Sequence, residues 1–222
     1  MTNQKIFSAS LMCINWLNVK EDIEAITSLG LDYIHYDILD GNFANDFTMG
    51  SSIINSITEF SRLPGDYHLM VEEPRRLFDM VQFNERDIVT IHQECCKNLH
   101  RDLIYLKKMN IKVGVALSPA TNIEVLEYII DDLDHIILMT VDPGYMGQEL
   151  VPQVFSKISN TRKLIEESSL NCTLAVDGNV NASNIKKMHD FGANFFVLGS
   201  TGLFTKKESL KDSFQKILSS FN

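Results

Sequence analysis

Four residues near the ends of short apolar runs have side chains that suit metal or acid–base chemistry. His35 and Asp37 lie in YIHYDIL, His68 lies in DYHLMVE, and Asp177 lies in CTLAVDG. Side chains alternate along a strand, so His35 and Asp37 point to one face. Burying an unpaired carboxylate is strongly unfavourable, so such a face needs partners. Two imidazoles and two carboxylates can surround a divalent cation, and the set predicts a metal or acid–base site.

Each of these residues also has a structural alternative when it is taken alone. A single histidine in a strand is often a core residue whose hydrogen bonds are satisfied. An aspartate before a glycine, as in VDG, is usually a turn former. The joint occurrence in three apolar runs favours the site over these alternatives.

Eight apolar runs recur along the chain and set the elements that must position the four residues. The runs are KIFSASLM, YIHYDIL, DYHLMVE, IVTIHQE, KVGVALS, HIILMTVD, CTLAVDG and FFVLGST. The segments of helical period are VKEDIEAITSLG, SIINSITEF, PRRLFDMVQF, LHRDLIYLKKM, NIEVLEYII, QVFSKISNTRKLIEES, ASNIKKMHDFG and ESLKDSFQKILSSF. This alternation of strands and helices predicts an α/β fold, a single (β/α)₈ TIM barrel that spans residues 1–222 as one catalytic domain. A doubly wound open sheet is the alternative, but SLMCIN is not the glycine-rich first turn that it usually has.

Chemistry in such a barrel gathers at the carboxyl ends of the strands, where the loops meet. Ser10 ends the first run. Met70 and Met139 lie late in the third and sixth runs, either as core residues or as the floor of an apolar pocket. His92 and Glu94 end the fourth run, where a pocket role and a structural role both stay open.

Glycine-bearing loops follow the last three runs, as PGYMGQ, VDGN and VLGSTG. Loops after the seventh and eighth strands of a barrel commonly bind phosphate through backbone N–H groups. Simple turn formation is the alternative for each glycine. We expect Gly178, Gly199 and Ser200 to contribute to a phosphate site.

The composition limits the partners of the protein. The net charge of −9 argues against a general nucleic-acid binder, since a phosphate backbone attracts basic surface. The four cysteines, Cys13, Cys95, Cys96 and Cys172, have no CxxC spacing, which favours reduced thiols in a cytoplasmic protein. No apolar run has the roughly 18 residues that a membrane span needs. We therefore expect neither a nucleic acid nor a membrane as a partner.

The motifs SLM, IHYDILDGNF, HLMVE, LMTVDPGYMGQ, VDG and GSTGLF occur in this order between Ser10 and Phe204. In these motifs and their spacing the chain resembles the ribulose-phosphate 3-epimerase family. The resemblance implies a metal-dependent barrel that inverts C3 of a ketose phosphate, with the loop after the sixth strand as a lid. It also implies one divalent metal ion, with zinc, iron, manganese and cobalt all open, and a homo-oligomer, as barrels of this kind often are.

The resemblance assigns a role to each candidate site residue. Asp37 and Asp177 would be the catalytic proton-transfer residues. The metal ligands would be His35, Asp37, His68 and Asp177. The substrate-binding residues would be Ser10, His68, Met70, Met139, Gly144, Gly147 and Gln148. The phosphate-binding residues would be Gly147, Gly178, Asn179, Gly199 and Ser200.

Within the family, SLMC, MTVDPG and GLF look more like allulose-6-phosphate 3-epimerase than like the pentose enzyme. We therefore expect conversion of D-allulose 6-phosphate to D-fructose 6-phosphate. The alternatives are conversion of D-ribulose 5-phosphate to D-xylulose 5-phosphate and a non-catalytic sugar-phosphate sensor. Leu39, the stretch 43–46 and Asn179 depart from the family pattern and affect the shape of the substrate pocket. A Schiff-base barrel is disfavoured, because Lys112 opens the fifth strand at the wrong end.

Overall fold

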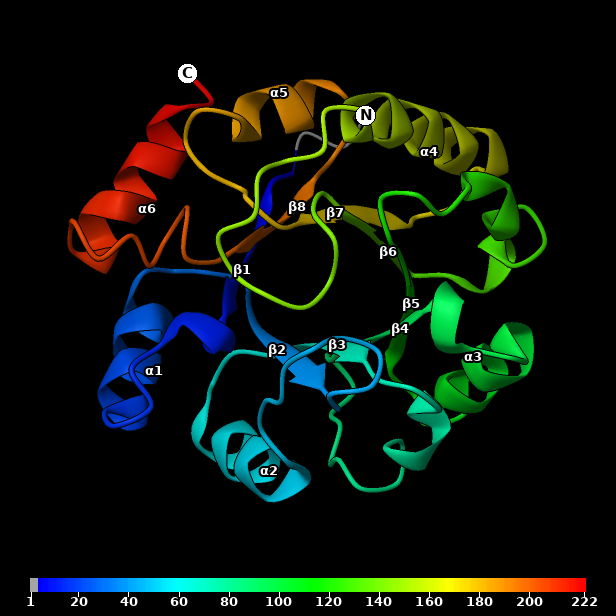
Figure 1. Ribbon diagram of the computed structural model, residues 1–222, viewed down its shortest axis with the longest axis horizontal. Coiled ribbons are helices and arrows are strands. Elements are labelled where there is room, and N and C mark those ends of the chain that lie inside the picture. The colour runs from blue at the N-terminus through cyan, green and yellow to red at the C-terminus, as the bar shows by residue number, and fades with distance from the viewer. Residues whose placement is uncertain (1–3) are drawn as a thin grey trace.

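Eight parallel strands close into a barrel in the computed structural model, which describes residues 4–222 (Figure 1). The strands are β1 (Ile6–Ser10), β2 (Tyr33–Leu39), β3 (Gly65–Met70), β4 (Ile88–His92), β5 (Lys112–Leu117), β6 (His135–Met139), β7 (Thr173–Asp177) and β8 (Phe195–Leu198). Each strand pairs with the next one along the chain, and β1 also pairs with β8. Every apolar run predicted as a strand forms one, and the predicted TIM barrel is confirmed.

Helices surround the barrel as an outer ring (Figure 1). The α-helices of the described chain are α1 (Val19–Ser28), α2 (Ser51–Phe60), α3 (Leu99–Lys107), α4 (Val154–Ser168), α5 (Ile185–Asp190) and α6 (Leu210–Ser219). Short 3₁₀ helices cover Leu11–Cys13, Pro74–Arg76, Gln93–Cys95, Ile123–Leu126 and Ile130–Asp132. The α-helices lie in segments whose apolar residues recur at helical spacing, whereas Leu11–Cys13 and Gln93–Cys95 directly follow strands.

The prediction of a helix after every strand is wrong after β3 and after β5. Segment 122–130 forms 3₁₀ turns, because four of its nine residues are β-branched and lower its helix propensity. The Asn122 side chain also accepts a hydrogen bond from the Glu124 N–H at 3.3 Å, which favours a tight turn. Segment 74–83 forms one 3₁₀ turn and further turns around the fully buried Phe78. A segment of about ten residues is marginal as a helix without extensive packing.

Strand residues alternate between the barrel interior and the side that faces the helices. In β2, Ile34 and Tyr36 join the large apolar layer between strands and helices, while His35 and Asp37, which alternate with them, point inward. The strand register places Asp37 beside His68 on β3. The fold therefore brings inward-facing polar side chains of neighbouring strands to the same height in the barrel.

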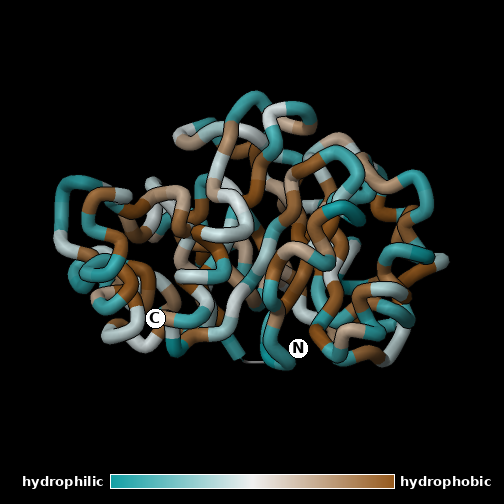
Figure 2. The backbone as a smooth tube through the Cα atoms, turned by 90° about the horizontal axis from the view of Figure 1, so that it is seen from below, coloured by the Kyte–Doolittle hydropathy of each residue, from teal (hydrophilic) through white to brown (hydrophobic). Residues whose placement is uncertain are grey.

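A smaller apolar cluster fills the barrel interior and includes Ile6, Ile88, Ile137 and Phe195. Figure 2 shows hydrophobic stretches running through the barrel and hydrophilic stretches along the outer loops. The interior is thus a packed core and not a pore, and the site is confined to the carboxyl end of the strands.

The loop between β6 and α4, residues 140–153, lies over the barrel opening (Figure 1). We call this segment the lid loop. The C-terminus lies at the opposite end of the barrel from the projecting loops (Figure 2). Within residues 4–222, the helices are all too short or too polar to cross a membrane.

Candidate active site

His35, Asp37, His68 and Asp177 meet at the carboxyl end of the barrel. One possible ligand atom from each lies within 4.8 Å of the others. His35 Nε2 is 3.2 Å from Asp37 Oδ1 and 3.7 Å from Asp177 Oδ2. His68 Nδ1 is 3.8 Å from Asp37 Oδ1 and 3.3 Å from Asp177 Oδ2. The structure therefore brings together all four residues that the sequence predicts as metal ligands.

Asp66 on β3 orients the His35 ring. Asp66 Oδ2 lies 2.6 Å from His35 Nδ1, and both side chains are fully buried. A carboxylate only accepts hydrogen bonds, so Nδ1 carries the proton and Nε2 is the atom that can bind a metal ion. Sequence reasoning missed Asp66, although its spacing of two residues from His68 places it on the same inward face.

His92 and Glu94 lie behind His68 and do not line the substrate pocket described below. His92 Nε2 is 2.9 Å from His68 Nε2, and His92 Nδ1 is 3.0 Å from Glu94 Oε2. Burial lowers the pKa of His92 to about 4. Of the two roles that the sequence left open, the structure therefore favours the structural one, as a support for His68.

The cluster attracts positive charge. Burial lowers the pKa of His35, but the negative charges of Asp37 and Asp66 outweigh it and raise this pKa well above 6.5. Burial raises the pKa of Asp37, yet the positive charge of His35 and its hydrogen bond hold it well below 3.8. Ser10 Oγ donates to Asp37 Oδ2 at 2.7 Å and fixes this carboxylate. Two carboxylates beside two imidazoles thus form a centre that a cation can neutralise.

The donor set fits a divalent cation. Among the described residues, His35 Nε2 and His68 Nδ1 are buried atoms without a hydrogen-bond partner. Leaving buried polar atoms unpaired is unfavourable, and both atoms face the space between the two carboxylates. Imidazole nitrogens and carboxylate oxygens suit zinc, iron, manganese and cobalt, and the donor set does not choose among them.

A pocket of about 640 Å³, which includes the solvent at its mouth, opens above the cluster. Asp37 and Asp177 reach this pocket, whereas His35 and His68 are buried beneath it. Predicted substrate-binding residues that line the pocket are Ser10, Met70, Met139, Gly144, Gly147 and Gln148. Predicted phosphate-binding residues that line it are Gly147, Gly178, Asn179, Gly199 and Ser200. His68, which was predicted to bind both the metal and the substrate, does not line the pocket.

Two of these side chains already have partners in the lid loop. Gln148 Nε2 donates to the carbonyl oxygens of Asp142 at 2.6 Å and Tyr145 at 3.1 Å. Asn179 Nδ2 donates to the carbonyl oxygen of Gln148 at 2.6 Å. These amides hold the lid loop to itself and to the loop after β7.

Sequence reasoning gave no site role to Cys13, Val141 or Thr201, which also line the pocket. Cys13 Sγ is 3.4 Å from Met146 Sδ, so the loop after β1 touches the lid loop. Burial raises the pKa of the Cys13 thiol to about 12 and keeps it protonated. The paths of three loops, those after β1, β6 and β8, determine these positions, and no local pattern of residues signals them.

The lysine required for Schiff-base chemistry is not found at this site. Lys112 begins β5 at the far end of the barrel, and its Nζ donates to the Tyr33 hydroxyl at 3.1 Å. In the described part of the chain, the lining of the pocket includes no lysine. The structure thus agrees with the position expected for Lys112.

Comparison with known sequences gives one family. The profile of the ribulose-phosphate 3 epimerase family matches residues 6–204. The ribulose-phosphate 3-epimerase of Bacillus subtilis is 34% identical over 206 residues, which are 91% of this chain and 95% of that protein. The chloroplastic ribulose-5-phosphate-3-epimerase of Arabidopsis thaliana is 35% identical over 198 residues, which are 88% of this chain and 70% of that protein.

Solved structures share the fold at low sequence identity. Phosphoribosyl anthranilate isomerase from Thermococcus kodakaraensis is 10% identical with a TM-score of 0.64, over 97% of this chain and 98% of that chain. Thiamine phosphate pyrophosphorylase from Pyrococcus furiosus is 11% identical with a TM-score of 0.62, over 98% of this chain and 95% of that chain. At such identity these likenesses support the barrel fold and carry no argument on activity.

Proposed function

Because this chain belongs to the ribulose-phosphate 3-epimerase family, we propose that it interconverts D-ribulose 5-phosphate and D-xylulose 5-phosphate by inverting C3. The family makes it an isomerase, a carbohydrate-phosphate epimerase, with a sugar phosphate as substrate. The observation that carries the proposal is the buried cluster of two histidines and two aspartates directly below the pocket.

We assign His35, Asp37, His68 and Asp177 as the ligands of one divalent cation. The unpaired His35 Nε2 and His68 Nδ1 support this assignment, as does the negative charge of the two carboxylates. When bound, such a cation supplies Lewis acidity that stabilises negative charge at the reacting end of the substrate. The family resemblance supports the same set, and the metal stays unspecified among zinc, iron, manganese and cobalt.

Asp37 and Asp177 are the proposed proton-transfer residues. Inversion at C3, next to the C2 carbonyl, requires removal of a proton from one face and delivery of a proton to the other. The two carboxylates come from β2 and β7, which are not neighbours in the barrel, and both reach the pocket. One carboxylate takes the C3 proton and the other, in its acid form, returns a proton to the opposite face. The hydroxyl of Ser10 holds Asp37 in place for this transfer.

The loops after β6, β7 and β8 are the proposed phosphate side of the site. Gly178 and Asn179 have φ values of +100° and +47°, a conformation that turns the chain sharply beside the pocket. A Cβ at Gly199 would meet only Cys13 Sγ, at 3.6 Å, so this glycine borders open space. Backbone N–H groups at Gly178, Gly199 and Ser200 would bind the phosphate, and the lid loop would exclude water from the reacting carbon.

We propose a pentulose phosphate as the substrate, in place of the hexulose phosphate that the branch motifs predict. The relatives in Bacillus subtilis and Arabidopsis thaliana are named for ribulose phosphate, and both match most of this chain. D-allulose 6-phosphate is the second candidate, because Cys13, Asn179 and Thr201, which belong to the motifs of the allulose branch, line the pocket. Both substrates present the same C2 carbonyl and C3 hydroxyl, so the distance from these groups to the phosphate must distinguish them.

The test is to measure kcat/KM for D-ribulose 5-phosphate and D-allulose 6-phosphate with the same preparation. We expect the pentulose to react faster by about tenfold or more, since one extra carbon is worth roughly 1–3 kcal/mol. A preference for the hexulose would contradict the proposed substrate and favour the second candidate. Absence of epimerisation of both would contradict the enzymatic mechanism as a whole.

A further inference from the structure

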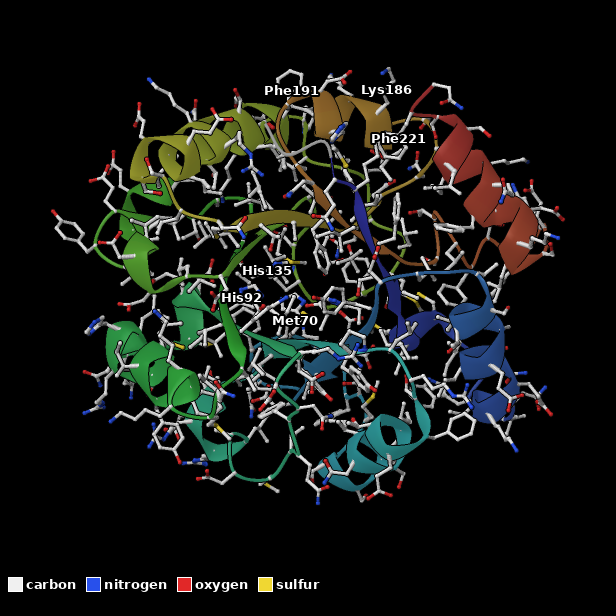
Figure 3. The ribbon with its side chains drawn as sticks, turned by 180° about the vertical axis from the view of Figure 1, so that it is seen from behind. Met70, His92, His135, Lys186, Phe191 and Phe221 are labelled. Carbon is white, nitrogen blue, oxygen red and sulfur yellow. The ribbon has the colours of Figure 1, made fainter. Side chains whose placement is uncertain are left out.

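A chain of hydrogen bonds runs from the metal-facing side of the barrel into the loop after β5. His68 Nδ1 faces Asp177, and on the other side of the ring His68 Nε2 is 2.9 Å from His92 Nε2. His92 Nδ1 is 3.0 Å from Glu94 Oε2. Figure 3 labels His92, which ends β4 and is fully buried. The catalytic scheme gives no role to His92 or Glu94.

The geometry of the two rings suits a direct N–H to N hydrogen bond. The ring planes of His68 and His92 differ by 22°, and their centroids are 5.0 Å apart. A donor N–H and an acceptor lone pair both lie in the plane of an imidazole ring, so nearly parallel rings that meet at their Nε2 atoms are well aligned. Both side chains are fully buried, which strengthens the bond.

The Glu94 end of this series of hydrogen bonds determines which nitrogens donate and which accept. The Glu94 carboxylate can only accept hydrogen bonds, so His92 Nδ1 carries a proton. In a neutral His92 the other nitrogen, Nε2, is then an acceptor, and His68 Nε2 must donate to it. A neutral His68 with its proton on Nε2 has its lone pair on Nδ1, the atom that faces the carboxylate cluster.

The carboxylate at the far end is itself firmly held. Ser118 N–H donates to Glu94 Oε1 at 2.7 Å, and the Thr121 hydroxyl donates to the same oxygen. Lys157 Nζ on α4 donates to the carbonyl oxygen of Ser118 at 2.7 Å and so fixes the loop after β5. Glu94 Oε1 is thus occupied, and Oε2 is directed to His92.

We propose that His92 and Glu94 are positioning residues that hold His68 in the tautomer with Nδ1 free to bind the metal ion. The arrangement mirrors that of His35, whose Nδ1 is held by Asp66 so that Nε2 binds instead. One histidine is oriented by a carboxylate directly, the other through a second imidazole. This inference rests on the proposed role of His68 as a metal ligand.

The experiment combines a metal titration with ¹⁵N NMR of the histidine rings in zinc-loaded protein at pH 7.5. In the wild-type protein, we expect the His68 Nε2 and His92 Nδ1 signals to be those of protonated nitrogens and the His68 Nδ1 signal to be that of a metal-bound nitrogen. Glu94→Ala and His92→Leu should weaken Co²⁺ binding about 10–100-fold. His92→Gln, whose amide oxygen can accept from His68 Nε2, should restore most of the affinity.

The matched control is Glu59→Ala, which removes one negative charge from an exposed site on α2 and should leave Co²⁺ affinity unchanged. Circular dichroism of each variant verifies that the barrel is folded. If the folded Glu94→Ala and His92→Leu variants bind Co²⁺ as tightly as the wild type, the positioning role is wrong, while the metal centre of the proposed function stands. Metal bound through His68 Nε2 in the zinc-loaded wild-type protein would also overturn it. If the wild-type protein binds no Co²⁺, Zn²⁺ or Mn²⁺, the metal centre of the proposed function fails, and the positioning role fails with it.

Discussion

The β2–β4 side of the barrel mouth presents imidazoles and carboxylates, whereas the β6–β8 side presents mainly glycines, amides and loop backbone. On the first side, the ligand side, His35 and His68 are fully buried and each is held by a partner on the next strand. On the second side, the loop side, Gly144, Gly147 and Gly178 all have positive φ values. Asp177 at the end of β7 is the one member of the buried cluster that the loop side contributes.

This difference separates two tasks. A metal centre needs donor atoms fixed by side-chain hydrogen bonds in a dry interior, because small displacements change the coordination. A phosphate site that must also admit and release a sugar needs backbone donors and a loop that can open. We therefore expect substitutions on the ligand side to affect metal content and chemistry, and those on the loop side to affect KM and substrate preference.

The largest effect is expected where the two sides meet, at the proton-transfer pair. Asp37→Asn and Asp177→Asn should each lower kcat by about 10³-fold or more, because inversion needs a base and an acid on opposite faces. The comparison is with Asp142→Asn, which changes an exposed carboxylate that lines the same pocket and should change kcat little. Turnover near that of the wild type in either cluster variant would refute the two-carboxylate scheme.

A second effect should be confined to the ligand side. His68→Ala should lose the metal ion, because it removes one of four donors from the cluster. Gln148→Ala on the loop side should retain the metal and raise KM instead, since it removes the hydrogen bonds from the Gln148 side chain to the carbonyls of Asp142 and Tyr145 that hold the lid loop in shape. Metal analysis of both purified variants measures this contrast. A His68→Ala protein with the full metal content would show that His68 is not a metal ligand.

A third effect should be confined to the loop side. Gly199→Ala should raise KM about tenfold without lowering thermal stability, because its Cβ would make only an ordinary contact with Cys13 yet stand at the proposed phosphate site. Gly50→Ala, where a Cβ meets nothing within 4 Å, is the matched control and should behave as the wild type. An unchanged KM in Gly199→Ala would place the phosphate elsewhere.

The smallest effect concerns the exposed tip of the lid loop. Tyr145 and Met146 are 69% and 51% exposed, so their removal should not disturb folding or metal content. We expect Tyr145→Ala and Met146→Ala to change the ratio of kcat/KM for pentulose and hexulose phosphates by less than about tenfold. A larger change would mean that the lid loop, and not the distance between cluster and phosphate side, determines the substrate.

The contrast between the two sides also explains what the sequence could predict. The sequence identified the four cluster residues, His35, Asp37, His68 and Asp177. Their residue types indicate the chemistry, and strand alternation indicates the face to which each side chain points. The eight strands were identifiable from their apolar runs. By contrast, Cys13 and Thr201 reach the pocket through the path of their loops, which no periodicity records. Asp66 was visible by spacing, but its role depends on the register of β2 and β3.

Helices after β3 and β5 were predicted from apolar spacing and are absent from the structure. Spacing alone does not distinguish an α-helix from a series of turns that bury the same residues. Phe78 and Leu126 are fully buried in these segments, as they would be in helices. Tertiary packing here overrides a weak local preference, which is typical for short segments.

The most direct test of the account is the fate of the C3 hydrogen during turnover in D₂O. The metal-loaded protein is incubated with D-ribulose 5-phosphate, and the C3 position of substrate and product is followed by NMR. Asp37 and Asp177 on opposite faces predict D-xylulose 5-phosphate that carries solvent deuterium at C3. Failure to form this product, or a product that retains the original hydrogen at C3, would contradict the account.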